Sequence, residues 1–220
     1  MKLLISIVTI DRDAYAIPLV YESIRKELEK FDFLIVCRKT DTNCIKIWKD
    51  LCPAVIIKTV PYYEIKKRHN VENICKKRNI CLDYAKNNGY DYLLFIDSDI
   101  IINENTLELL LQGCEKYNAD VCSVPYHVKW LGYTSIGVQK NDKFDFIKVL
   151  KDSDNIIYLK GGGGTGCTLI KSTVFHIPFS IAKIKIRSVF VVGEDIGFFI
   201  NLVKNNFLLL YIKNHEIRHL

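Results

Sequence analysis

An apolar segment that runs directly into two carboxylates constrains this chain more than any other feature. Residues 92–96 are all apolar or aromatic, and Asp97-Ser98-Asp99 follow at once. Side chains two apart in an extended segment point the same way, so Asp97 and Asp99 face one side and Ser98 the other. When two carboxylates lie this near to each other, ionisation of both is unfavourable unless a cation is present. The pattern predicts either a buried strand that ends at a cation site or a solvated turn that caps the next helix.

Apolar runs alternate with segments of helical period through the first 126 residues. Gly89 stands where a helix should end. Strands and helices in this order predict an α/β fold, with a mainly parallel sheet flanked by helices. Ligands of such sheets bind at the carboxyl ends of the strands, which singles out residues 9–12 and 97–99. The predicted strands are 3–10, 33–37, 54–60, 91–96 and 119–126, and the predicted helices are 17–31, 43–51, 70–88 and 103–118.

The alternation fades beyond residue 127. Residues 155–175 have the pattern of a strand, a glycine-rich turn and a second strand, and 193–206 and 207–212 that of a helix and a strand. The sequence contains no internal repeat and no linker. We therefore expect a single domain over residues 1–220, with one lobe over about 1–126 and a second over about 127–220.

The net charge and the cysteines restrict which ligands and which cellular compartment fit this chain. The formal net charge of +6 is spread along the chain, which fits a protein that handles anions and equally fits ordinary lysine-rich usage. No basic run is interleaved with aromatic residues, so the sequence gives no support for nucleic-acid binding. The eight cysteines form no C-x-x-C pair and mostly lie in apolar context. We expect buried, reduced thiols and a cytoplasmic protein rather than disulfides or a zinc site.

The first ten residues resemble a signal peptide only superficially. Their apolar run is short, stops at Asp11-Arg12-Asp13 and has no small-residue cleavage site after it. We interpret them as the first buried strand. No stretch of the sequence is long and apolar enough to predict a transmembrane helix.

Five segments together resemble the glycosyltransferases of the GT-A fold, and their order and rough spacing match that family over nearly the whole chain. They are "SIVTIDRDAY", "KKRNICLDYAKNNGYDYLLFIDSD", "GGGGTGCTLIKSTVF", "GEDIGFFINLVKNNF" and "IRHL". The overall pattern is most similar to small glycosyltransferases of large DNA viruses of algae and amoebae. The resemblance implies a Rossmann-like, mixed but mainly parallel sheet. It also implies a nucleotide-binding first lobe and a sugar- and acceptor-binding second lobe.

The activity that the resemblance implies is metal-dependent transfer of a sugar from a nucleotide diphosphate to a hydroxyl of a glycan acceptor. UDP is the nucleotide that this family most often uses. Asp97 and Asp99, with Ser98 beside the donor, would hold Mn²⁺ or Mg²⁺, whose preferred ligands are oxygens. The metal would stabilise the departing diphosphate. His219 would be a further ligand; His215 is the competing candidate, and a surface histidine is the alternative for both.

Asp195 is implied as the general base that removes the proton of the acceptor hydroxyl, which favours inversion over retention. Glu194 would bind hydroxyls of donor or acceptor. Both acidic residues also suit a helix N-terminus, where the helix dipole favours negative charge. Arg78 would pair with Asp97 or the diphosphate, because a guanidinium suits both; a solvated arginine is the alternative.

Two further segments are implied to contact the donor. Thr9, Asp11 and Arg12 would meet the base and ribose, although Asp11 also fits a helix cap. Gly164 and Thr165, in the glycine-rich run, would form a wall of the sugar pocket, and a flexible hairpin is the alternative. The sequence departs from the family pattern at Cys37-Arg38, where many relatives carry an acidic residue near the base.

Two other functions stay open on the sequence alone. A sugar nucleotidyltransferase has a related sheet, but its first loop often contains glycine, and "TIDRDAY" has none. A non-catalytic module that binds a nucleotide or a carbohydrate would carry the same residues without using Asp195 as a base.

Overall fold

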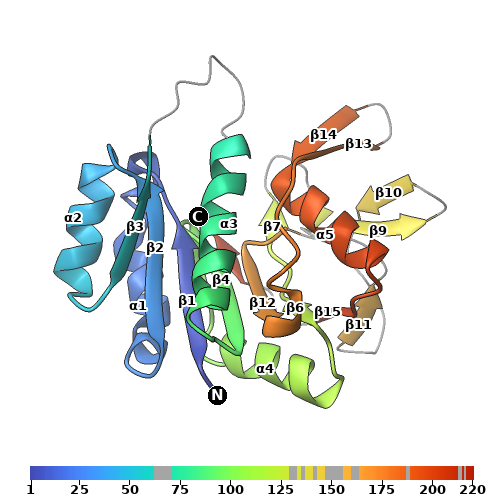
Figure 1. Ribbon diagram of the computed structural model, residues 1–220, viewed down its shortest axis with the longest axis horizontal. Coiled ribbons are helices and arrows are strands. Elements are labelled where there is room, and N and C mark those ends of the chain that lie inside the picture. The colour runs from blue at the N-terminus through green and yellow to red at the C-terminus, as the bar shows by residue number, and fades with distance from the viewer. Residues whose placement is uncertain are drawn as a thin grey trace.

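The computed structural model contains one mixed sheet with helices on both faces (Figure 1). Its eight strands are ordered β11-β15-β6-β12-β4-β1-β2-β3. The residues that the structure describes are 1–61, 71–128, 133–134, 137–140, 143–146, 156–159, 164–186, 189–212, 215 and 217–220. The predicted glycine run at 161–163 lies outside this part of the chain.

Six of the eight strands run in the same direction. β1 pairs in parallel with β2 and β4, β2 with β3, and β6 with β15, whereas β12 is antiparallel to β4 and β6, and β11 is antiparallel to β15. The predicted mixed, mainly parallel sheet is confirmed. The strand bounds are β1 Leu3–Val8, β2 Asp32–Arg38, β3 Ile56–Val60, β4 Tyr92–Asp97, β6 Val121–Ser123, β11 Ile156–Leu159, β12 Cys167–Lys171 and β15 Leu209–Ile212.

Helices cover both faces of the sheet because its central strands are apolar on both sides. In β1, Leu3, Ile5 and Ile7 belong to one buried cluster and Leu4 to the other, as the two-residue period of a strand requires. Three helices contribute to the first cluster and two to the second. They are α1 (Ile17–Leu28), α2 (Thr42–Leu51) and α4 (Thr106–Lys116), then α3 (Val71–Asn87) and α5 (Glu194–Lys204).

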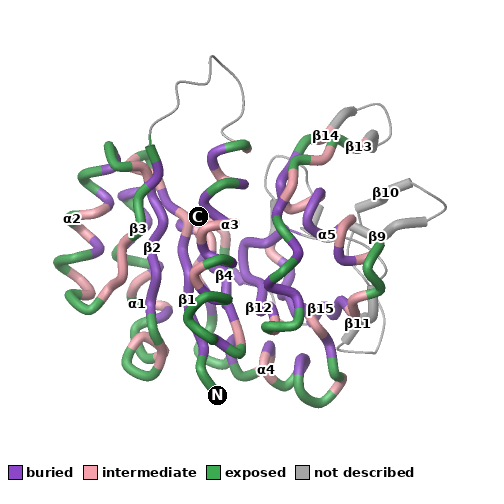
Figure 2. Tube along the Cα trace, viewed as in Figure 1, coloured by how far each residue is buried: buried purple, intermediate pink, exposed green. Residues whose placement is uncertain are grey.

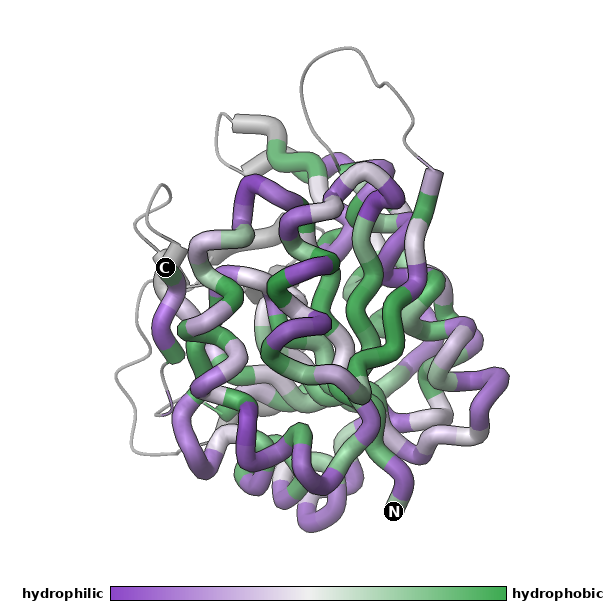
Figure 3. Tube along the Cα trace, turned by 90° about the vertical axis from the view of Figure 1, so that its left-hand side faces the viewer, coloured by the Kyte–Doolittle hydropathy of each residue, from purple (hydrophilic) through white to green (hydrophobic). Residues whose placement is uncertain are grey.

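The burial and hydropathy views agree with this layering. The strands are buried and the outward faces of the helices are exposed (Figure 2). Apolar residues gather along the strands, and hydrophilic residues lie mainly on the surrounding helices (Figure 3). Seven of the eight cysteines are buried, as their apolar contexts predict. Among the described residues, no helix combines the length and apolar character needed to cross a bilayer.

The predicted elements agree with the structure except at their ends. Gly89 has φ +65° and ends α3, as predicted. The predicted strand 119–126 is shorter, because only Val121–Ser123 (β6) pair with neighbouring strands on both sides. The predicted strand 3–10 ends at Val8, and Asp11–Asp13 form a short 3₁₀ turn instead.

Four smaller strand pairings lie outside the main sheet in the part of the chain that the structure describes. β5 (Ile100–Ile101) pairs with β16 (Arg218–His219), and this pairing brings the end of the chain beside the segment that follows β4. β13 (Ala182–Ile186) forms a hairpin with β14 (Val189–Gly193), which leads directly into α5. The remaining pairs are β7 (His127–Val128) with β8 (Tyr133–Thr134) and β9 (Gly137–Lys140) with β10 (Lys143–Phe146).

Substitution of Gly197 would test how closely α5 packs against the backbone of Ser180. A Cβ at this position would overlap the backbone carbonyl oxygen of Ser180, which cannot rotate away. Alanine gains about 1 kcal/mol over glycine in a helix, but overpacking typically costs about 1–3 kcal/mol, and overlap with backbone lies at the upper end. Gly197→Ala should therefore lower the free energy of unfolding, measured in urea, by about 2 kcal/mol. Lys204→Ala, exposed on the same helix, is the control; equal stability of both variants would contradict this packing.

Candidate functional site

The carboxyl ends of β1, β2 and β4 meet at one edge of the sheet because these strands are parallel neighbours. Asp97 is the last residue of β4, and its backbone N–H donates to the carbonyl of Gly166 at 2.8 Å. The residue before β12 is thus hydrogen-bonded to the backbone of Asp97. The first turn of α5, with Glu194 and Asp195, approaches the same place.

A buried guanidinium joins these elements. Arg78 on α3 is 3% exposed; its Nη2 donates to Asp97 Oδ1 at 2.7 Å and its Nε to Glu194 Oε1 at 3.2 Å. Its guanidinium also lies over the rings of Phe95 and Phe179, at 5.3 and 5.7 Å from the ring centroids. Burial acts to lower the pKa of Arg78, but Asp97 and Glu194 outweigh it and raise the pKa above its ordinary value. Arg78 therefore stays charged and holds two carboxylates from distant parts of the chain.

Asp99 contacts the last described residues of the chain. His219 Nε2 lies 3.1 Å from Asp99 Oδ2, and the Leu220 N–H donates to the Asp99 carbonyl at 2.9 Å. Burial first, and then the charge of Asp97, raise the pKa of Asp99, and His219 partly offsets this. The competing candidate His215 lies elsewhere, with its Nε2 2.7 Å from Thr106 Oγ1 at the start of α4. The structure therefore brings His219, and not His215, to the Asp-Ser-Asp segment.

The chemistry of these residues fits a divalent cation, although their present contacts do not form a metal site. Among the described residues, no three histidine, cysteine, aspartate or glutamate side chains are arranged as metal ligands. One oxygen of Asp97 is bound to Arg78, and one of Asp99 is bound to His219. Burial and the charge of Asp97 raise the pKa of Asp99, so its charged form is disfavoured here and a bound cation would favour it. Two carboxylates and an imidazole are ligands that suit Mn²⁺ and Mg²⁺.

Asp13 is a third carboxylate at this place, and the sequence analysis did not single it out. The Ser98 hydroxyl donates to Asp13 Oδ2 at 2.9 Å, and Asp13 also contributes to the raised pKa of Asp99. Ser98 is buried and its hydroxyl is used in this contact. The repeat of acidic residues in Asp11-Arg12-Asp13, after the first strand, is the signal that could have pointed to it.

Asp195 lies in an environment that keeps its carboxyl protonated at unusually high pH. Burial, followed by the charge of neighbouring Glu194, raises the pKa of Asp195 to about 7. Its Oδ1 accepts the backbone N–H of Ile196 at 2.7 Å, which favours the charged form and opposes the shift. A carboxylate with a pKa near neutrality is well matched to general-base chemistry.

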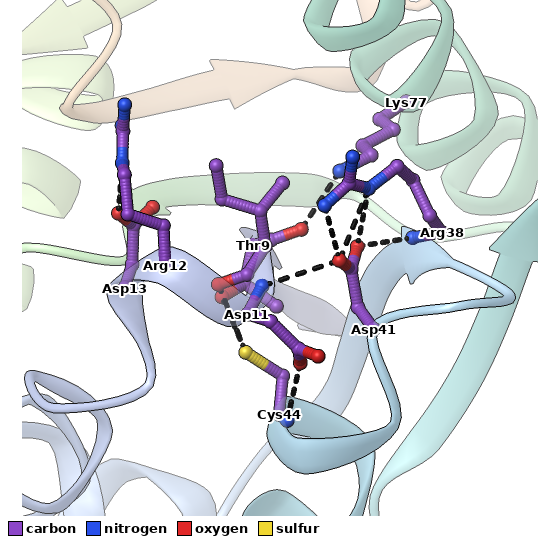
Figure 4. Close-up of polar contacts among 9 residues, drawn as sticks. Thr9, Asp11, Arg12, Asp13, Arg38, Asp41, Cys44 and Lys77 are labelled. Carbon is purple, nitrogen blue, oxygen red and sulfur yellow. Dashed lines mark hydrogen bonds and ion pairs between the residues drawn. The ribbon is translucent and has the colours of Figure 1, made fainter. Parts of the chain in front are cut away.

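The residues after β1 are more enclosed than their predicted role implies (Figure 4). Thr9 is 1% exposed and all its polar groups are paired within the protein: its N–H with Val36, its carbonyl with Lys77 and its hydroxyl with Cys44. Asp11 Oδ1 accepts the backbone N–H of Cys44 in the first turn of α2 at 2.9 Å. Asp11 thus caps a helix, although not the one that follows it in sequence.

Arg12 and the glycine-rich segment differ in exposure. The Arg12 side chain is exposed and pairs with Asp13 at 3.2 Å. Gly164 and Thr165 are buried next to Gly166, whose carbonyl binds Asp97. Thr165 Oγ1 has no hydrogen-bond partner within the described part of the chain. A buried hydroxyl without a partner is costly, so this one is a candidate to bind a polar ligand.

A charged pair that the sequence analysis missed lies at the end of β2. Arg38 Nη2 donates to Asp41 Oδ1 at 2.6 Å, and Asp41 is 1% exposed. An acidic residue thus lies just after the strand, at Asp41, but its carboxylate is paired with Arg38 inside the protein. The two residues are only three positions apart, but no motif of the sequence marks Asp41.

Comparison with known proteins agrees with this architecture. A family model described as Glycosyl transferase family 2 matches residues 7–167, more than half of the chain. A search of curated proteins finds no match.

Solved structures of S. aureus TarS 1-349 are similar in fold. One has a TM-score of 0.62 at 15% identity and covers 99% of this chain and 59% of that chain. The complex with UDP-GlcNAc has a TM-score of 0.62 at 15% identity (99% and 57%), and the complex with UDP has 0.60 at 14% (99% and 59%). The chain therefore spans less than two thirds of the length of these TarS chains.

The raised pKa of Asp195 predicts an unusual dependence of stability on pH. The folded carboxyl titrates at about 7, whereas the unfolded one titrates at about 3.9. Between these values the folded state binds more protons, so this group destabilises the folded chain progressively as pH rises from about 4 to about 7. Asp195→Asn should remove this contribution, seen as a wild-type minus variant difference in urea denaturation across that range. Asp50→Asn, exposed on α2, is the control; a flat difference for Asp195→Asn would refute the raised pKa.

Proposed function

Since the chain belongs to glycosyl transferase family 2 and is therefore a glycosyltransferase, we propose that it moves a sugar from a UDP-sugar to a hydroxyl of a glycan acceptor, with inversion. Family membership favours this reaction over the nucleotidyltransferase and the non-catalytic module. We further propose that residues 1–220 act as a single catalytic domain, with nucleotide bound over about 1–126 and sugar and acceptor over about 127–220, in the cytoplasm.

One observation carries the proposal: Arg78 holds Asp97 and Glu194 together, and Asp195 follows Glu194. Asp97, a carboxylate suited to binding the donor side, is thereby held on the same buried cation as Glu194, the direct neighbour of the carboxylate suited to act as a base. The reaction needs both kinds of group around one anomeric carbon. A fold-level resemblance alone would not require this pairing.

In the proposed reaction, the acceptor oxygen forms a bond to the anomeric carbon while the bond from that carbon to the diphosphate oxygen breaks. Asp195 accepts the hydroxyl proton, and UDP leaves with the electron pair of the broken bond. A bound Mn²⁺ or Mg²⁺ supplies Lewis-acid stabilisation of the diphosphate, and Asp97, Asp99 and His219 are the residues that would hold it. Arg78 binds both Asp97 and Glu194, and Asp195 follows Glu194 in the first turn of α5.

UDP as the nucleotide is supported by the solved complexes of TarS with UDP-GlcNAc and UDP, whose fold this chain shares. Arg12 is the exposed residue of the first loop that would reach the donor. Thr165, with its buried hydroxyl that has no partner within the described residues, would contact the sugar. Gly164 beside it leaves space for the donor because it has no side chain.

Asp195→Asn should abolish transfer and spare binding of the donor. Removing a general base typically costs about 10²–10⁴-fold in rate, and asparagine keeps the shape of the side chain. The measurements are release of UDP from UDP-GlcNAc or UDP-glucose with a saccharide acceptor, and titration of UDP by calorimetry. Asp50→Asn is the matched control. Transfer by Asp195→Asn within tenfold of the wild-type rate would rule out this residue as the base.

Metal binding is testable without turnover. Mn²⁺ added with UDP should raise the Tm of the wild-type chain more than UDP alone, because a ligand bound only by the folded state stabilises it by mass action. Asp97→Asn and Asp99→Asn should each lose this extra increment, and chelator should stop transfer. Asp83→Asn, exposed on α3, should behave as wild type. An unchanged increment in both site variants would place any metal elsewhere.

A further inference from the structure

Four charged side chains gather around residues 9–11, and the proposed reaction uses none of them as acid, base or metal ligand. They are Asp11, Arg38, Asp41 and Lys77 (Figure 4). They come from the 3₁₀ turn after β1, the end of β2, the residue before α2 and the middle of α3. Residues 9–12 are the segment expected to meet the base and ribose of the donor.

Asp41 has its acceptor capacity filled by the protein. Its carboxylate accepts the Arg38 backbone N–H at 2.8 Å, the Arg38 guanidinium at 2.6–3.0 Å and the Asp11 backbone N–H at 3.2 Å. Burial acts to raise the pKa of Asp41, but the bonds from Arg38 outweigh it and lower the pKa below its ordinary value. A buried carboxylate with all these donors is not available to accept a hydrogen bond from a nucleobase.

Lys77 is a fully buried amine that contacts the same loop. Its Nζ donates to the Thr9 carbonyl at 2.7 Å. Burial lowers the pKa of Lys77, and Asp41 is the charge that most opposes this. Since a buried ammonium is costly without compensation, the negative charge of Asp41 helps to keep Lys77 charged beside this loop. The side chain has no exposed surface through which it could touch a ligand directly.

The loops after β1 and β2 are bound to each other reciprocally. Asp41 accepts the N–H of Asp11, and Asp11 in turn accepts the N–H of Cys44 in the first turn of α2. The Cys44 thiol donates to the carbonyl of Ile10 at 3.0 Å. Every contact is made within the protein, so the loop has one defined shape before any nucleotide arrives. Such preorganisation reduces the ordering entropy that binding must otherwise overcome.

We propose that Asp41 and Lys77 are positioning residues, which hold residues 9–11 in their nucleotide-binding shape without reading the base. This inference rests on the proposed function. A positioning role and direct recognition of the base by Asp41 predict different effects on nucleotide binding. A carboxylate that read the base would accept the ring N–H of uracil or guanine, which adenine and cytosine lack. Loss of a positioning residue should instead weaken all nucleotides alike.

The test is calorimetric titration of UDP, GDP, ADP and CDP into wild type, Lys77→Met, Lys77→Arg and Asp41→Asn. Lys77→Met should raise Kd about tenfold for each nucleotide that the wild type binds, the effect expected for one lost hydrogen bond to a charged group. Lys77→Arg keeps a donor for Thr9 and should restore binding to within about threefold. In transfer assays, KM for the donor should rise more than kcat falls. Lys76→Met, exposed on the same helix, is the control.

The outcomes are distinct. Loss confined to UDP and GDP in Asp41→Asn would show direct base reading and overturn the inference, as would unchanged Kd in both Lys77→Met and Asp41→Asn. Wild-type chain that binds none of the four nucleotides would overturn the proposed function and the inference with it. Circular dichroism and thermal unfolding establish that each variant is folded at the titration temperature. If Lys77→Met is not folded at that temperature, the titrations of Asp41→Asn decide the test, because asparagine retains one acceptor oxygen.

Discussion

One buried guanidinium holds the candidate site together. Arg78 on α3 binds the carboxylate at the end of β4 and another at the start of α5. Loss of one member of a buried ion pair typically costs about 3–5 kcal/mol, because the remaining charge is left uncompensated. Without Arg78, Asp97 and Glu194 would face each other as like charges beside Asp195. The positions of Asp97 and of the first turn of α5 relative to each other therefore depend on Arg78.

Sequence patterns could predict the sheet and its functional edge because both follow from local rules. Alternating strands and helices imply parallel pairing, and parallel pairing gathers the carboxyl ends of strands, Asp97 included, at one edge. The alternation of elements could not predict which distant side chains meet there. The family resemblance placed His219 with Asp99, 120 positions away, but neither the patterns nor the resemblance paired Arg78 with Glu194, 116 positions away. Such contacts depend on the antiparallel insertion of β12 and on the β5–β16 pairing.

Thr9 and Asp41 show a second limit of sequence reasoning. Residue type marked Thr9 as a polar group at a strand end, yet its polar atoms are all used inside the protein. Asp41 carries no motif and lies beyond the position where an acidic residue is usual, yet it binds both Arg38 and the first loop. The neighbours of a polar residue in space decide whether it can bind a ligand or is hydrogen-bonded within the protein. Burial and hydrogen-bond partners reveal that difference, and spacing along the chain does not.

The pairing of β16 with β5 also bears on the order in which the molecule assembles. Leu4 of β1 pairs with Asp32 of β2, 28 positions along the chain, whereas Asp99 meets His219, 120 positions along it. Chain entropy opposes such long closures until the intervening segments have collapsed. The two carboxylates of the Asp-Ser-Asp segment therefore acquire their partners at different times, Asp97 from a helix 19 positions away and Asp99 from the far end of the chain.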